Sequence, residues 1–204
     1  MQVENHKEGV PFEYYVNLFK ELEPQEAADR TGVAFDGKAF TLRLADAVYT
    51  ICWPEYAISA DKEDAFALKS LPTQTFLLRY LLEGRKVAAK GTYKTFREMP
   101  WGELYIQPFT GRCLTRAAFT FGTRVENFVA AMEKLGGKKL PHGDAGYELE
   151  LLPGYTMRLI VWAGDEEFPP NSQILYSDNF AEGFAAEDRV VAGDILISVV
   201  KNRM

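Results

Sequence analysis

The chain has 204 residues, of which 47% are hydrophobic, and its formal net charge at pH 7 is −6. This length is enough for one sizeable core, and no linker rich in Pro, Ser or Gly divides it, so we predict a single domain over residues 1–204. The negative charge argues against a general nucleic-acid binder, which normally carries a basic surface.

The sequence predicts a cytoplasmic protein that has no membrane partner. Its first ten residues lack the basic and apolar regions of a signal peptide, and no run reaches the roughly 18 apolar residues that span a bilayer. Cys52 and Cys113 have no CxxC partner, so we expect free, buried thiols. A zinc site would have to combine them with His6 and His142, four isolated residues, and we therefore predict no metal site and no cofactor.

The first part of the chain predicts two helices and a β-meander. Apolar residues recur at helical spacing in Pro11–Glu23, and Pro24–Arg30 is expected to form a second, short helix. Asp36-Gly37 is typical of a tight hairpin turn, and it precedes alternating apolar residues. Val48–Trp53 and Tyr56–Ser59 continue the meander.

Pro72–Gly84 predicts a helix that is apolar on almost every face. Phe76 stacks over Tyr80, Leu77 over Leu81 and Leu78 over Leu82 in three adjacent apolar stripes. Such a helix cannot lie on a surface. We expect it to be the buried helix around which the fold is organised.

The second part predicts a strand pair after Gly84 and then alternates helices with strands. Thr123–Leu135 is expected to be a helix, Tyr147–Leu152 and Tyr155–Trp162 a hairpin, Gln173–Tyr176 a further strand and Asp188–Val200 the closing helix. Regular β-α alternation, which a parallel sheet needs, is missing. The order predicts an α+β fold in which mainly antiparallel sheets pack around a buried central helix, with helices near both ends.

A segment rich in basic and aromatic residues follows the buried helix. Its members are Arg85, Lys86, Lys90, Lys94 and Arg97, with Tyr93, Phe96, Trp101 and Tyr105 among them. One interpretation is a binding strip for an anion or a nucleobase. The other is a solvated loop with aromatic anchors in the core, and we favour it because the negative net charge does not suit binding of single-stranded nucleic acid.

Within this segment, Arg97, Glu98, Trp101 and Tyr105 are candidate ligand-binding residues, because Trp and Arg are frequent in recognition pockets. The alternative is a turn pinned by a buried Trp101. We favour that alternative, since Pro100 and Gly102 flank the tryptophan as turn formers.

The strongest irregularity of charge lies between Arg158 and Arg189. This window has no Lys or Arg and holds seven acids: Asp165, Glu166, Glu167, Asp178, Glu182, Glu187 and Asp188. It can bind a hard cation, receive a basic partner or supply paired carboxylates, although a solvated rim is the favoured interpretation. The candidates for ligand contacts are Asp165, Glu166, Glu167, Asp178 and Asn179. If Asp165–Glu167 and Asp178–Asn179 converge, their oxygens can form a partial shell for Mg²⁺ or Ca²⁺.

Several sequence segments resemble a family of bacterial and archaeal domains of unknown function. They are TFLLRYLLEG, TFREMPWGELY and GDEEFPPNSQILYSDNFAEGFAAED, and the likeness spans most of the chain from the meander onward. The resemblance implies a family whose members occur largely in anaerobes. Some of these members are fused to a small iron–sulfur-cluster domain of the sort found in corrinoid proteins. This chain has no such cysteine cluster, so the cluster does not carry over. The resemblance implies a shared fold but no activity and no functional residues.

Motifs that would assign an enzyme class are missing from the sequence: GxGxxG, GxxxxGK[ST], HExxH, GxSxG and the EF-hand loop. We therefore expect a non-catalytic protein that binds a small molecule or a partner protein, in an anaerobic redox or one-carbon setting. The alternative is a small hydrolase or transferase that uses carboxylates from Asp165–Glu167 and Asp178, with Arg97 holding an anion.

Overall fold

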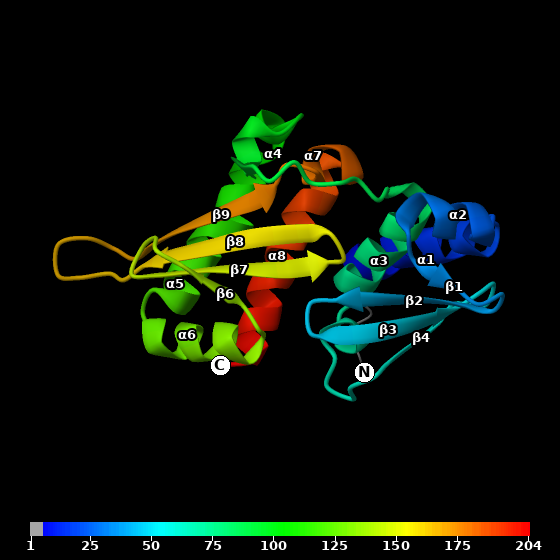
Figure 1. Ribbon diagram of the computed structural model, residues 1–204, viewed down its shortest axis with the longest axis horizontal. Coiled ribbons are helices and arrows are strands. Elements are labelled where there is room, and N and C mark those ends of the chain that lie inside the picture. Colours follow the sequence, from blue (N-terminus) through cyan, green and yellow to red (C-terminus); the bar gives the residue numbers. More distant parts are fainter. Residues whose placement is uncertain (1–5) are drawn as a thin grey trace. The chain divides into compact units, whose positions relative to one another are not determined.

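The structure, a computed structural model, describes residues 6–204, and its contacts divide the chain into two compact units, Met1–Lys86 and Val87–Met204. Each unit contains one antiparallel sheet with helices packed against it (Figure 1). The predicted α+β class is therefore confirmed. The single-domain organisation stays a prediction.

The first unit is a four-stranded meander with three helices. Its elements are α1 (His6–Lys20), α2 (Pro24–Thr31), β1 (Ala34–Phe35), β2 (Ala39–Leu44), β3 (Ala47–Cys52), β4 (Ala57–Ala60), the 3-10 turn Phe66–Lys69 and α3 (Leu71–Glu83). The strands follow the order β1-β2-β3-β4. The predicted Asp36-Gly37 turn joins β1 to β2, and the Asp36 carboxylate accepts hydrogen bonds from the backbone N–H groups of Lys38 and Ala39 at 2.9 and 2.8 Å.

The predicted buried helix is confirmed as α3, which forms the core of this unit. Leu77, Leu78 and Leu81 are fully buried, because the apolar stripes face both α1 and the remainder of the core. Ser70 precedes the helix and caps it, since its hydroxyl accepts from the N–H of Thr73.

The second unit is a five-stranded sheet covered by helices on one face (Figure 1). Its elements are β5 (Tyr93–Thr95), the 3-10 turn Phe96–Glu98, α4 (Gly102–Phe109), a π-helical segment (Thr110–Thr115), α5 (Arg116–Phe121), α6 (Val125–Lys134), β6 (Lys138–Leu140), β7 (Ala145–Leu152), β8 (Tyr155–Trp162), β9 (Asn171–Ser177), α7 (Phe180–Gly183) and α8 (Ala186–Asn202). The strand order is β5-β9-β8-β7-β6. The uncovered face carries polar pairs, such as Arg158 with Glu148 at 2.9 Å.

The predicted strand pair after Gly84 is wrong. Only the short strand β5 forms there, and a continuous helical stretch from Gly102 to Phe121 follows it. The sequence pattern did not predict a helix here, because Pro108 and Gly111 lie inside this stretch and both residues are unfavourable in a helix interior. The predicted helix Thr123–Leu135, the hairpin and the closing helix are confirmed as α6, β7–β8 and α8, whereas β9 begins two residues earlier than predicted.

Both cysteines are free, as predicted, but only Cys113 is buried. Its thiol donates to the Val190 carbonyl at 3.4 Å, and burial raises its pKa to about 12. Cys52 is exposed, which corrects the prediction, because the outward positions alternate along β3 and Cys52 is one of them. His142 is exposed in a loop, whereas the side chain of His6 lies outside the described part of the chain. Within residues 6–204, no helix combines the length and apolar character needed to cross a membrane.

Candidate ligand-binding site

The segment between β5 and α4 is a tightly bonded turn. Glu98 closes it, because its Oε2 accepts from the backbone N–H and from the hydroxyl of Thr95, both at 2.7 Å. These hydrogen bonds lower the pKa of Glu98, since they stabilise its ionised form. Glu98 therefore has a structural task, and the ligand-binding role predicted for it stays untested.

Trp101 follows in the same turn and points to solvent. Its side chain is 71% exposed and its φ is 64°, a left-handed conformation that costs free energy for any residue with a Cβ. The neighbouring Gly102 has no room for a side chain, since a Cβ would lie 2.2 Å from the Phe96 carbonyl oxygen. The predicted turn pinned by a buried tryptophan is therefore wrong: backbone packing and hydrogen bonds hold the turn, and they present Trp101 outward.

Arg189 of α8 supports this turn from the protein interior. Its side chain is 1% exposed, and its Nη2 donates to the Pro100 carbonyl at 2.6 Å. Its Nη1 has no hydrogen-bond partner among the described residues, and burial lowers the pKa of the guanidinium. Burial of this cation costs free energy, which its hydrogen bonds to the carbonyls of Pro100 and Ala185 partly offset, and the first of these bonds ties the turn to α8.

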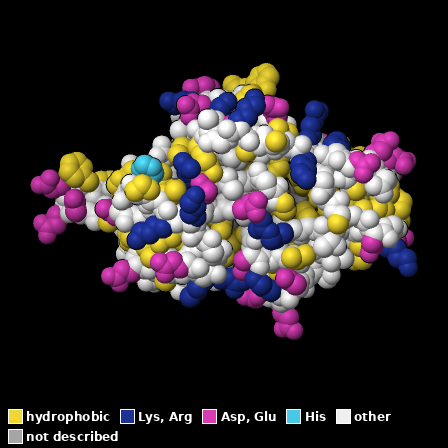
Figure 2. All heavy atoms as spheres, in the orientation of Figure 1, with side chains coloured by type: hydrophobic (Ala, Val, Ile, Leu, Met, Phe, Trp, Pro, Cys, Tyr) yellow, Lys and Arg dark blue, Asp and Glu magenta, His cyan; other side chains and the backbone are white. Residues whose placement is uncertain are grey.

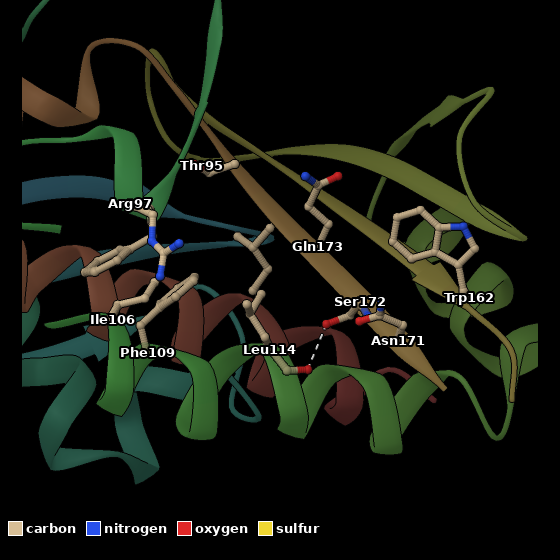
Figure 3. A pocket seen from close by; sticks show the side chains of 11 residues that line it. Thr95, Arg97, Ile106, Phe109, Leu114, Trp162, Asn171, Ser172 and Gln173 are labelled. Carbon is tan, nitrogen blue, oxygen red and sulfur yellow. Dashed lines mark hydrogen bonds between the residues drawn. The ribbon is translucent and has the colours of Figure 1, made fainter. Parts of the chain in front are cut away.

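A pocket of about 350 Å³ lies beside this turn (Figure 3). Its lining comes from the turn, from the helical stretch and from the strands β8 and β9: Thr95, Phe96, Arg97, Ile106, Phe109, Leu114, Trp162, Asn171, Ser172, Gln173 and Ile174. Phe96 and Phe109 stack with ring centroids 4.3 Å apart. The volume is at the lower end of the range for small-ligand sites, and the apolar lining is typical of them.

The π-helical segment forms one wall of the pocket. It follows Pro108, which cannot donate a backbone hydrogen bond, and it turns the Leu114 carbonyl towards β9, where the carbonyl accepts from Ser172 Oγ at 2.7 Å (Figure 3). Short π segments inside α-helices occur frequently at functional sites. The pocket thus lies between two irregular pieces of backbone, the Trp101 turn and the π segment, and such irregularities cluster at functional sites.

The lining combines apolar side chains with five polar ones, which are Thr95, Arg97, Asn171, Ser172 and Gln173. Arg97 is the one charged residue of the described lining, and it forms an exposed ion pair with Glu103 at 3.2 Å. In the close view, Arg97 lies at one end near Ile106 and Phe109, the Gln173 amide is near the middle and Trp162 lies at the other end (Figure 3). An aromatic and aliphatic floor with one cation at its mouth suits a ligand that has an apolar body and an anionic group.

The acidic candidates lie elsewhere and hold loops. Asp178 follows β9, and its carboxylate accepts from Lys90 N, Thr92 N and Thr92 Oγ1 at 2.9, 3.1 and 2.6 Å. Its pKa is lowered by these bonds. The buried Asn179 donates to the carbonyls of Val87 and Gly154, both at 2.8 Å. These two residues anchor the segment that leads into β5.

Asp165, Glu166 and Glu167 lie in the exposed loop before β9, whose tip carries acidic and apolar side chains (Figure 2). Asp165 accepts from Glu167 N and Phe168 N at 2.8 and 2.7 Å, which lowers its pKa and shapes the loop. The seven residues of β9 span about 23 Å and separate this loop from Asp178. The two acidic segments therefore do not converge, and the condition for the predicted magnesium or calcium shell is not met.

The structure brings only Arg97 of the predicted residues into the pocket, while Trp101 and Tyr105 lie exposed on the adjoining turn and on α4. The sequence interpretation missed the helical wall, Trp162 and the first half of β9. One signal was present: Thr95-Phe96-Arg97-Glu98 matches the T-x-x-E capping pattern, which predicts the structural task of Glu98.

Comparison with known proteins gives one match. Residues 23–199 match a family described as a domain of unknown function (DUF3786). No curated protein and no solved structure matches the chain.

Proposed function

Since the chain belongs to the family of the domain of unknown function (DUF3786), whose description carries no activity, we propose a function from the geometry of its pocket. The protein is a non-catalytic binding protein, and its pocket takes a ligand with an apolar body and a carboxylate or similar anionic group. The apolar body lies over Phe96, Phe109 and Leu114, and the anionic group pairs with Arg97.

The observation that carries this proposal is the position of Arg97. It lies at the mouth of an apolar pocket, and Glu103 is its described ionic partner there. An exposed ion pair of this kind contributes little to stability, so a ligand anion can replace Glu103 at small cost. The rival carboxylate chemistry lacks support, because Asp165 and Asp178 lie at opposite ends of β9 and hold loops.

The biological setting is part of the proposal. The ligand is a small molecule or a segment of a partner protein, and it is neither nucleic acid nor membrane. The bacterial or archaeal origin, the cytoplasmic location and the anaerobic redox or one-carbon setting rest on sequence composition and resemblance alone.

Two simple acids, 4-methylpentanoate and 3-phenylpropionate, test the proposal by NMR titration of the labelled protein. We expect both to shift the backbone amide signals around Phe96 and Arg97, and their neutral amides to bind about tenfold more weakly because they lose the charge-assisted contact. Arg97→Gln should weaken binding of the acids about as much. Arg124→Gln, which removes an exposed arginine outside the pocket, should leave binding unchanged. Equal titrations of acids and amides would overturn the proposal.

A further inference from the structure

A second groove lies wholly within the first unit, where three helices meet. One side of α2 borders it, and the end of α1 and the last turn of α3 complete it; both α1 and α2 pack against α3. The groove has a volume of about 570 Å³, and its lining consists of three leucines, one alanine, four glutamates and one arginine. Acidic side chains gather over α2 in the space-filling view (Figure 2). The groove is therefore both apolar and acidic.

The apolar part of the groove continues into an exposed row on α1. Leu18, Leu22 and Leu82 line the groove; Leu18 is 36% exposed and the other two are half-buried. Tyr14 is 59% exposed and precedes Leu18 by four residues, so the two side chains lie on the same side of α1. Exposed apolar surface that is rimmed by polar residues marks interaction sites. A partner that follows this row along α1 reaches beyond the volume that a small molecule in the groove occupies.

The carboxylates of the groove have few partners of their own. Among the side chains that the structure describes, those of Glu21, Glu23 and Glu26 form no hydrogen bond and no ion pair. Glu83 pairs with Arg79 at 3.7 Å, and its side chain is 58% exposed. The helices α1 and α3 end at the groove, where a helix carries partial negative charge, and Glu23 and Glu26 offset the positive end of α2. The local field is therefore negative.

Arg30 is the one cation of the described lining, and backbone carbonyls occupy it. Its Nη1 donates to the Gly84 carbonyl at 2.6 Å, and its Nη2 donates to the Leu81 carbonyl at 2.7 Å. These carbonyls lie at the end of α3, so Arg30 caps that helix and leaves the four glutamates of the groove in excess. An apolar surface with excess negative charge complements a partner that is apolar and cationic.

We propose that this groove binds a basic amphipathic helix of a partner protein. Apolar residues of that helix at i and i+4 pack on Leu18, Leu22 and Leu82, and Lys or Arg residues on both sides of this row face Glu21 and Glu26. This is recognition of a helix in a groove, in which a few apolar anchors give affinity and the flanking charges give selectivity. The row on α1 that begins at Tyr14 extends the contact.

The probe is a helical peptide about four turns long, in which Leu recurs at i and i+4 and Lys stands on both sides of that row. NMR titration of the labelled full chain measures its binding, and we expect the amide signals of Leu18, Leu22 and Ala27 to shift. A peptide of the same composition with Leu spread around the helix, and one with Glu in place of Lys, should each bind at least about tenfold more weakly. Equal binding of the rearranged peptide, or an absence of binding by the probe, would contradict the inference.

Two double variants test the position of the site. Glu21→Gln/Glu26→Gln should weaken peptide binding about fivefold or more, because two charge contacts are lost. Glu21→Gln alone, which lies outside the helices, should act in the same direction. Glu55→Gln/Glu63→Gln removes two exposed acids of the same unit outside the groove, so it changes the net charge equally and should leave binding unchanged. Equal weakening by the two double variants would show that the peptide responds to net charge alone and would refute the site.

Small amines separate a partner protein from a small ligand. Hexylammonium and spermidine carry positive charge and methylene groups but cannot cover the apolar row on α1, so they should bind at least about tenfold more weakly than the peptide. If either amine binds as tightly as the peptide, the partner helix is rejected. Arg97→Gln should leave peptide binding unchanged, because Arg97 is not part of this groove. Failure of the peptide therefore leaves the proposed function of the Arg97 pocket intact.

Discussion

Trp101 combines properties that stability alone does not explain. A large aromatic side chain is exposed, its backbone is held in a left-handed conformation, and Gly102 and Arg189 constrain the turn around it. Glycine adopts this conformation without the steric cost that a Cβ brings. A tryptophan therefore occupies a position where glycine would avoid this steric cost, and the ligand-binding role predicted for Trp101 stays a prediction.

Replacing Trp101 separates these contributions. Trp101→Gly should make the protein about 1 kcal/mol more stable than Trp101→Ala, because both variants lose the same side chain and only glycine relieves the left-handed strain. Urea unfolding of the two variants measures the difference. If the alanine variant is as stable as the glycine variant, the turn is not strained at this position.

At the scale of single residues, Arg97 lines the pocket, whereas its ligand-binding role and those of Glu98, Trp101 and Tyr105 stay predictions. Trp101 was expected to be buried because flanking Pro100 and Gly102 are turn formers, but such residues determine the turn and not the direction of the side chain between them. The acids were grouped because they are close in sequence. A strand between Asp165 and Asp178 keeps them apart, and only pairing in three dimensions shows this.

At the scale of elements, periodic patterns predicted α3, α6, α8 and the β7–β8 hairpin, because each is stabilised by a continuous apolar face. The helical stretch Gly102–Phe121 could not be predicted in this way, since Pro108 and Gly111 interrupt its pattern and the π segment shifts its phase. The sequence did not predict the pocket either. Its walls come from this stretch and from a strand about sixty residues later, and only the packing of the second unit brings them together.

The buried helix α3 provides a prediction at this scale. Leu78 and Leu81 are both fully buried, so Leu78→Ala and Leu81→Ala should each lower the free energy of unfolding by about 2–5 kcal/mol, through lost burial and the cavity left behind. Leu104→Ala is the matched control, because Leu104 is also helical but 71% exposed and should change stability by less than about 0.5 kcal/mol. Losses below about 1 kcal/mol at both buried sites would show that α3 is peripheral. Urea unfolding followed by circular dichroism measures all three variants.

At the scale of the whole molecule, the family match extends over parts of both compact units. Each unit has its own sheet and its own buried side chains, with α3 at the core of the first and the helices α5, α6 and α8 packed on the sheet of the second. Two such cores can unfold together or separately. The single-domain prediction requires that they unfold together.

The tryptophans distinguish these outcomes, because Trp53 belongs to the first unit whereas Trp101 and Trp162 belong to the second. Trp101→Phe/Trp162→Phe leaves Trp53 as the fluorescent probe, and Trp53→Phe leaves the other two. In each variant, the urea midpoint from fluorescence is compared with that from circular dichroism on the same sample, so that each variant is its own control for any change in stability. A single domain predicts coincident midpoints in both variants, since all probes then report one cooperative transition. A fluorescence midpoint that departs from the circular dichroism midpoint, in opposite directions in the two variants, would show that the units are separate domains.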